Sequence, residues 1–155
     1  MAVEKAERVI SEQFREFEYW DQAPDCELSA LLLHSANGIL IERRSEIALR
    51  YPGQWDLPGE QLRESDQTPS DAIARKIKQQ PGLRSLSPSL LTSFDDLDIS
   101  TGKILRHHVF FAQVEDAPDV QHEGEVKWIP LDDAASSHRL SHAAVRALAS
   151  FRRRL

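Results

Sequence analysis

Three polar side chains, those of Lys76, Gln79 and Gln80, stand at positions i, i+3 and i+4 of one segment. On an α-helix, residues at this spacing share one face. A lysine ammonium binds phosphate as a point charge, and a glutamine amide can add hydrogen bonds. Mg²⁺ prefers carboxylate and water oxygens, and a lysine would repel it. The face therefore favours a phosphate contact over a metal site, with ordinary solvated helix residues as the alternative.

Acidic side chains outside this segment offer a second chemistry. Carboxylates from loops can hold a divalent metal or act as a general base. The candidate metal ligands are Glu60, Glu64, Asp66 and Glu125. Of these, Glu60, Glu64 and Glu125 are also the candidate catalytic residues.

Histidines extend the metal options toward zinc or iron, since imidazole suits these ions. The candidates are His107, His108 and His122. Adjacent residues on a strand point to opposite faces, so His107 and His108 do not easily enter one site. Strand packing or surface exposure is the simpler interpretation of these side chains.

The polar face is expected to lie on a helix. Thr68 is a suitable N-cap, Pro69 fits the first turn, and Asp71 stands where a capping-box acid reaches back. Ile73 and Ile77 are four residues apart and would face the core. A Pro-Gly pair then ends the helix.

Strands must position this helix. Apolar runs predict strands over residues 28–33 and 39–41, joined by a hairpin turn at Asn37-Gly38. Further strands are expected over residues 86–94 and 104–114. Ser141 would cap a last helix from His142 to about Arg152. Asp95, Asp96 and Asp98 are expected to form an acidic loop without function.

The run from Trp55 to Glu60, followed by the run from Arg75 to Leu83, resembles the signature of the Nudix family in frame and spacing. Members of that family usually cleave diphosphate linkages in nucleotides and related metabolites with magnesium. The family's three helical glutamates are replaced here by Lys76, Gln79 and Gln80. Gln67 stands where a further glutamate is expected, with Asp66 one residue away, and the loop is one residue longer.

The resemblance covers about Glu27 to the C-terminus and implies an α/β fold, the Nudix α/β/α sandwich with a mixed β-sheet between helices. Residues 1–26 are then an N-terminal helical extension, with a helix over about residues 6–19, and residues 27–155 are the Nudix-fold domain. The resemblance also implies that Arg75 orients the motif loop through ion pairs, with Glu60, Glu64 or Asp66 as partner.

The candidate ligand-binding residues include two positions outside the helix. Trp55 could stack on a base or pack the loop onto the sheet. Arg44 could grip a phosphate, and one residue of the Arg43-Arg44 pair is expected to face solvent. The full predicted set is Trp55, Arg44, Arg75, Lys76, Gln79 and Gln80.

Composition restricts the class of protein. The chain has 155 residues, 28% of them charged and 41% hydrophobic, which is typical of one globular domain. The net charge of −6 argues against a nucleic-acid partner, and the sequence has no apolar run of membrane-spanning length. With Cys26 as its single cysteine, the chain is expected in the cytoplasm.

Three functions remain open. The favoured one is binding of a nucleotide or other small diphosphate-containing molecule without ordinary hydrolysis, and hence without a resident cofactor. The second is diphosphate hydrolysis with Mg or Mn on relocated loop acids. The third is another chemistry on the same fold, such as isomerisation of isoprenoid diphosphates. The resemblance also makes a homodimer an open option.

Overall fold

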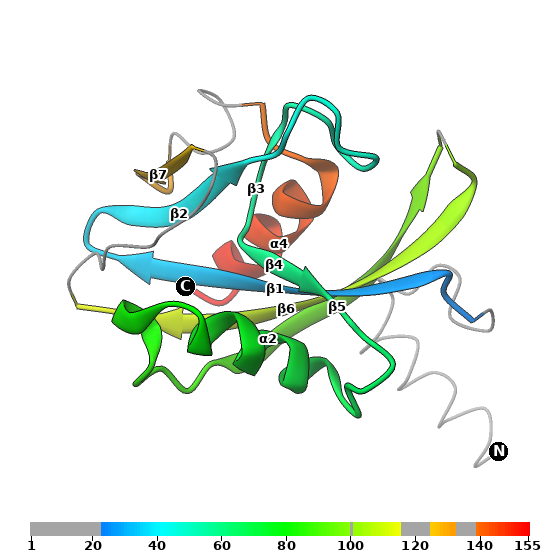
Figure 1. Ribbon diagram of the computed structural model, residues 1–155. Helices are drawn as coiled ribbons and strands as arrows, with labels where there is room; N and C mark the ends of the chain where they lie inside the picture. Colours follow the sequence, from blue (N-terminus) through cyan, green and yellow to red (C-terminus); the bar gives the residue numbers. More distant parts are fainter. Residues whose placement is uncertain (1–22, 100, 116–124, 133–138) are drawn as a thin grey trace, which may run out of the picture.

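The computed structural model describes residues 23–99, 101–115, 125–132 and 139–155. Within these ranges the chain forms one mixed sheet and two α-helices (Figure 1). The strands are β1 (Cys26–Ser35), β2 (Gly38–Arg43), β3 (Trp55–Asp56), β4 (Gly59–Gln61), β5 (Ser89–Asp98), β6 (Lys103–Gln113) and β7 (Val126–Ile129). The helices are α2 (Pro69–Lys78), the 3₁₀ turn η1 (Pro81–Leu83) and α4 (His142–Arg152).

The sheet changes partner along β1. The strand order is β3-β2-β1-β6-β5, with β1 and β6 parallel and the other pairs antiparallel. The first half of β1 pairs with β4, whereas β2 pairs with β1 only at the hairpin end, His34 with Ile39 and Ser35 with Gly38. β2 and β4 therefore diverge on the same side of β1, which leaves room for a cleft.

Helices cover both faces of the sheet (Figure 1). Ile73 and Ile77 of α2 pack with Leu31 and Leu33 on one face. On the other face α4 packs its alanines and Phe151 against a second apolar cluster. This arrangement confirms the predicted α/β/α sandwich with a mixed sheet between helices.

Local sequence signals explain the element ends. Asp71 accepts hydrogen bonds from the backbone N–H groups of Gln67 and Thr68, at 2.8 and 3.0 Å, which completes the predicted cap of α2. Ser141 Oγ accepts the Ala144 N–H at 3.0 Å and so caps α4. The boundaries of α4 agree with the sequence prediction.

The predicted acidic loop at Asp95, Asp96 and Asp98 is wrong, because β5 continues through all three residues. Asp95 and Asp96 are buried. Asp95 lies opposite Arg106 in the register and accepts its Nε at 2.8 Å and its Nη2 at 3.1 Å. The cross-strand arginine compensates the low strand preference of aspartate.

The predicted N-terminal helix and His122 lie outside the described residues, so both stay predictions. No helix in the described part of the chain is long and apolar enough to cross a membrane.

Candidate functional site

A cleft lies where β2 and β4 diverge beside β1. It contains about 580 Å³ of empty space, counting the part open to solvent. The sheet forms one wall, and the start of α4 and residues 50–51 of the β2–β3 connection form others. Its polar lining residues are Ser29, Glu42, Arg44, Arg50, Tyr51, Asp56, Glu60, Gln61 and His107.

Two buried carboxyl groups line the cleft on adjacent strands. Glu42 of β2 is paired in register with Asp56 of β3. Burial raises the pKa of Glu42 to about 7, and the nearby Lys76 ammonium partly offsets this rise. Burial also raises the pKa of Asp56, although the Ser141 hydroxyl and the Leu57 N–H donate to Oδ1 at 2.9 and 2.8 Å. Glu42 can therefore exchange a proton near neutral pH.

His107 lies on the far side of β1 from Glu42, in the part of the cleft formed by β6. Its ring stacks on Phe94 of β5, with ring centroids 5.0 Å apart. Burial lowers the pKa of His107 to about 4, so the imidazole is neutral at pH 7. His108, the next residue, bonds instead to Ser93 and Glu27, at 2.8 and 3.0 Å. These contacts agree with the expectation that His107 and His108 do not enter one site.

The β2–β3 connection brings positive charge to the cleft. Arg44 and Arg50 both line it, and the Nε of Arg44 donates to the Arg50 carbonyl oxygen at 2.6 Å. Tyr51 has a positive φ of 45°, and its hydroxyl donates to Asp96 of β5. His142 of α4 contacts the other oxygen of Asp96 at 3.1 Å. The connection is thus tied to β5 beside the cleft.

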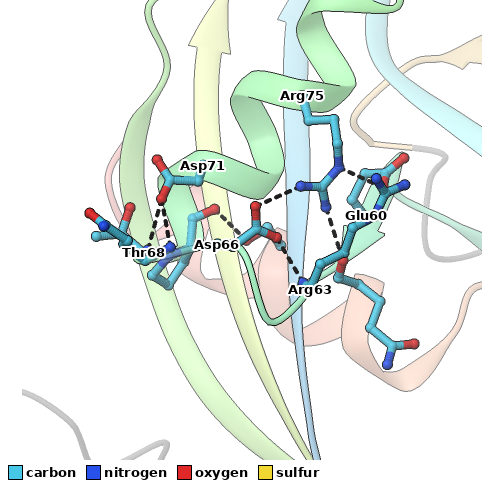
Figure 2. Close-up of polar contacts among 10 residues, drawn as sticks. Glu60, Arg63, Asp66, Thr68, Asp71 and Arg75 are labelled. Carbon is cyan, nitrogen blue, oxygen red and sulfur yellow. Dashed lines mark hydrogen bonds and ion pairs between the residues drawn. The ribbon is translucent and has the colours of Figure 1, made fainter.

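Arg75 joins α2 to the loop before it (Figure 2). Its Nη1 lies 2.6 Å from Asp66 Oδ1, its Nη2 donates to the Gln61 carbonyl oxygen at 3.2 Å, and its Nε lies 3.6 Å from Glu60 Oε2. The hydrogen bond from Arg75, followed by the Arg63 N–H, lowers the pKa of Asp66. Two of the three predicted acids, Asp66 and Glu60, therefore pair with Arg75.

The predicted polar face of α2 is only partly accessible. Lys76 is half-buried, and its ammonium is close enough to Glu42 to lower the pKa of that carboxyl, although Lys76 is not itself a lining residue of the cleft. Gln79 is exposed, whereas Gln80 is buried behind the end of the helix. A lysine and two neutral amides do not fit Mg²⁺, since anionic oxygens supply most of the affinity for this ion.

The remaining predicted acids lie apart. Glu64 is exposed, and Glu125 pairs with Arg43 at 3.3 Å. Arg43 also pairs with Glu46 at 3.1 Å. Both arginines of the Arg43-Arg44 pair are half-buried, so the expectation that one of them faces solvent stays a prediction. Among the described residues no three His, Cys, Asp or Glu side chains are grouped as they would be to hold a metal ion. A relocated metal site stays a prediction.

Trp55 belongs to the core rather than to the cleft lining. Its side chain is buried in the cluster under α4, and Lys127 Nζ lies 5.1 Å from its ring centroid. This position supports the packing interpretation of Trp55.

The sequence did not point to several lining residues of the cleft, namely Glu42, Arg50, Tyr51 and Asp56. It offered His107 as a metal ligand but not as a lining residue. One signal was present for Glu42, a lone acid directly after the apolar run of β2. The others depend on which strands diverge, and a single sequence does not reveal that.

Comparison with known proteins agrees with this architecture. A family model described as "NUDIX domain" matches residues 28–151. Among curated proteins, none matches the chain by sequence.

Solved structures with a similar fold include a MutT protein from Methanosarcina mazei Go1, with 23% identity, a TM-score of 0.67, and coverage of 86% of this chain and 96% of that one. A MutT NUDIX hydrolase from Burkholderia pseudomallei has 23% identity and a TM-score of 0.68, covering 83% and 98%. The NUDIX domain of Shewanella oneidensis NrtR, complexed with ADP ribose, has 18% identity and a TM-score of 0.68, covering 93% and 97%. At these identities the similarity shows a shared fold.

Proposed function

Because the chain belongs to the Nudix family, we propose that it binds a nucleotide or another diphosphate-containing small molecule in the cleft, without ordinary magnesium-dependent hydrolysis. The observation that carries this proposal is the Lys76 ammonium beside the cleft carboxyl of Glu42. Lys76 stands at the position of a helical glutamate in the family signature.

Electrostatics supports the loss of hydrolysis. At about 4 Å a lysine and each unit of cation charge repel by roughly 4 kcal/mol at an effective dielectric constant near 20. Gln79 supplies a neutral amide oxygen, which does not offset this repulsion. An ammonium can instead neutralise phosphate charge, although it lacks the Lewis acidity of a metal.

The cleft also supplies further cations for phosphate. Arg44 and Arg50 line it, and a guanidinium can bind phosphate oxygens through two parallel hydrogen bonds. The cleft is open to solvent, so a ligand can enter it from outside. ADP-ribose, the ligand of the similar NrtR domain, is therefore a reasonable first probe.

The test is isothermal titration calorimetry with ADP-ribose, with and without Mg²⁺ or Mn²⁺. We expect binding that does not depend on the metal, and no turnover at ordinary hydrolase rates. Lys76→Gln should weaken ADP-ribose binding about ten-fold, because one charge-assisted hydrogen bond is lost. Lys78→Gln, an exposed change on the same helix, is the matched control. Metal-dependent binding with rapid product release would contradict the proposal.

One observation favours the alternative of a diphosphohydrolase with relocated ligands. Glu42, with a pKa of about 7, lies near Glu60 in the cleft and could accept a proton from water. In that case Glu60→Gln would abolish turnover, and Glu64→Gln and Glu125→Gln would test the other two predicted acids. Turnover that survives all three changes would reject this alternative.

A further inference from the structure

The feature that leads beyond diphosphate binding is the Nε2 atom of His107. The side chain is buried and lines the cleft, yet within the described ranges Nε2 has no hydrogen-bond partner. Leaving a buried polar atom unpaired costs free energy, so such atoms are rare in folded proteins. A ligand in the cleft is a natural source of the missing partner.

His107 is suited to an uncharged partner. Its pKa of about 4, caused by burial, leaves the ring neutral at pH 7, with one nitrogen a donor and the other an acceptor. A neutral imidazole offers no charge to a phosphate. A group with hydrogen-bonding nitrogens or oxygens and no net charge fits it better.

The walls near His107 favour a planar ring. The apolar lining residues beside His107 are Leu28, its partner on β1, Val109, two residues along β6, and Phe94, on which its ring stacks. Apolar surface beside a single hydrogen-bonding side chain suits a heterocycle, whereas a sugar needs more hydrogen-bond partners. Across β1 from His107 the cleft is lined by Glu42, whose pKa the nearby Lys76 ammonium lowers.

We propose that His107 is a specificity-determining residue that hydrogen-bonds the uncharged heterocyclic base of a nucleotide through Nε2, with the diphosphate on the Lys76 side of β1. This inference rests on the proposed function and adds the ligand class and its orientation. The base lies over β6, where His107 stacks on Phe94.

The test compares ligand fragments. The probes are the four ribonucleosides, their 5′-diphosphates, ADP-ribose and ribose 5-phosphate, titrated calorimetrically into the full chain. His107→Phe keeps an aromatic ring against Phe94 and removes the nitrogens, and His107→Gln restores a donor and an acceptor. His108→Phe, one residue along and bonded to Ser93 and Glu27, is the matched control. Urea unfolding verifies that each variant is folded.

We expect at least one nucleoside to bind without phosphate. His107→Phe should weaken that nucleoside and its diphosphate roughly ten-fold, the effect of one hydrogen bond. His107→Gln should recover part of this affinity, and ribose 5-phosphate should respond to neither change. The ¹⁵N resonance of His107 Nε2 should shift with the nucleoside and not with ribose 5-phosphate.

Two results separate the proposals. Wild-type affinity for the nucleoside diphosphate in His107→Phe, or an equal loss for ribose 5-phosphate, overturns the base contact and leaves diphosphate binding standing. Absence of binding by ADP-ribose and every nucleotide to the wild-type chain overturns the proposed function as well.

Discussion

Replacing Glu42 with glutamine should stabilise the protein at neutral and alkaline pH. The rise of its pKa from 4.5 to about 7 reflects burial. At about 1.4 kcal/mol per pH unit, ionised Glu42 costs the folded state up to about 3 kcal/mol. Glutamine has nearly the same shape without the charge. For a chain of this length the gain corresponds to a rise in Tm of roughly 6–12 °C.

The pH window follows from the raised pKa of Glu42. Below pH 4.5 the carboxyl is protonated in both the folded and the unfolded state, so Glu42→Gln changes little. Between pH 4.5 and about 7 the unfolded state releases the proton and the folded state keeps it, so the wild type loses stability as pH rises. The advantage of Glu42→Gln therefore grows across this window and is constant above it.

His107 has the opposite effect over nearly the same range. Its pKa falls from 6.5 to about 4 because it is buried, so the unfolded state takes up a proton first as pH falls. The free energy of unfolding of the wild type then falls by up to about 3 kcal/mol as pH drops from 6.5 to 4. The two slopes nearly cancel in the wild type. In Glu42→Gln only the His107 effect remains, so the free energy of unfolding should fall as pH drops from 6.5 to 4. In His107→Phe only the Glu42 effect remains, so the free energy of unfolding should fall as pH rises from 4.5 to about 7.

The assay is urea unfolding followed by tryptophan fluorescence at half-unit steps from pH 4 to 8. Glu64→Gln, which removes an exposed carboxyl of equal charge, is the control and should change the free energy of unfolding by less than about 0.5 kcal/mol. A difference between Glu42→Gln and wild type that stays constant across the pH range would refute the reasoning, because it would mean that Glu42 is not desolvated.

Two further predictions concern the frame of the cleft. Gly38→Ala should destabilise the chain by more than about 1 kcal/mol in the same unfolding assay, since φ is +107° and the added Cβ would lie 1.8 Å from the Ile129 carbonyl oxygen. Gly102→Ala, at φ +70° with nothing within 4 Å, should cost less, and equal losses would contradict the steric argument. Ser141→Ala should cost about 1–3 kcal/mol, because it removes both the cap of α4 and a donor to buried Asp56, whereas Ser141→Thr should retain most of the stability. Equal unfolding midpoints for Ser141→Ala and the wild type would count against this role.

Local signals were sufficient to predict several elements. The α2 cap, the hairpin between β1 and β2 and the α4 start depend on residues near one another in the chain, and the structure confirms each of them. The hairpin turn lies one residue earlier than predicted, because Gly38 already pairs with Ser35 as the first residue of β2. Asp95 and Asp96 misled the prediction because aspartate is rare in strands, and the compensating Arg106 comes from the next strand.

The cleft itself was harder to predict. Strand alternation placed His107 and His108 on opposite faces, but the partner change of β1 decides which face opens into the cleft. The family signature offered three acids as partners of Arg75, and only the folded loop selects Asp66 and Glu60. The pairing of strands in the folded sheet, rather than the sequence motif, thus decides which residues line the cleft.

The Arg75 contacts have a consequence for how the helix could be redesigned. Arg75 ties α2 to Asp66, Glu60 and the Gln61 carbonyl, so contacts within the chain hold the helix against the preceding loop. The residue that holds the helix in place, Arg75, is therefore different from the residues that stand at the family's metal-ligand positions, Lys76 and Gln79. Lys76→Glu and Gln79→Glu would place two carboxylates on a helix that Arg75 already holds in position. A measured gain or lack of metal affinity would then reflect the ligand side chains rather than a change in the position of the helix.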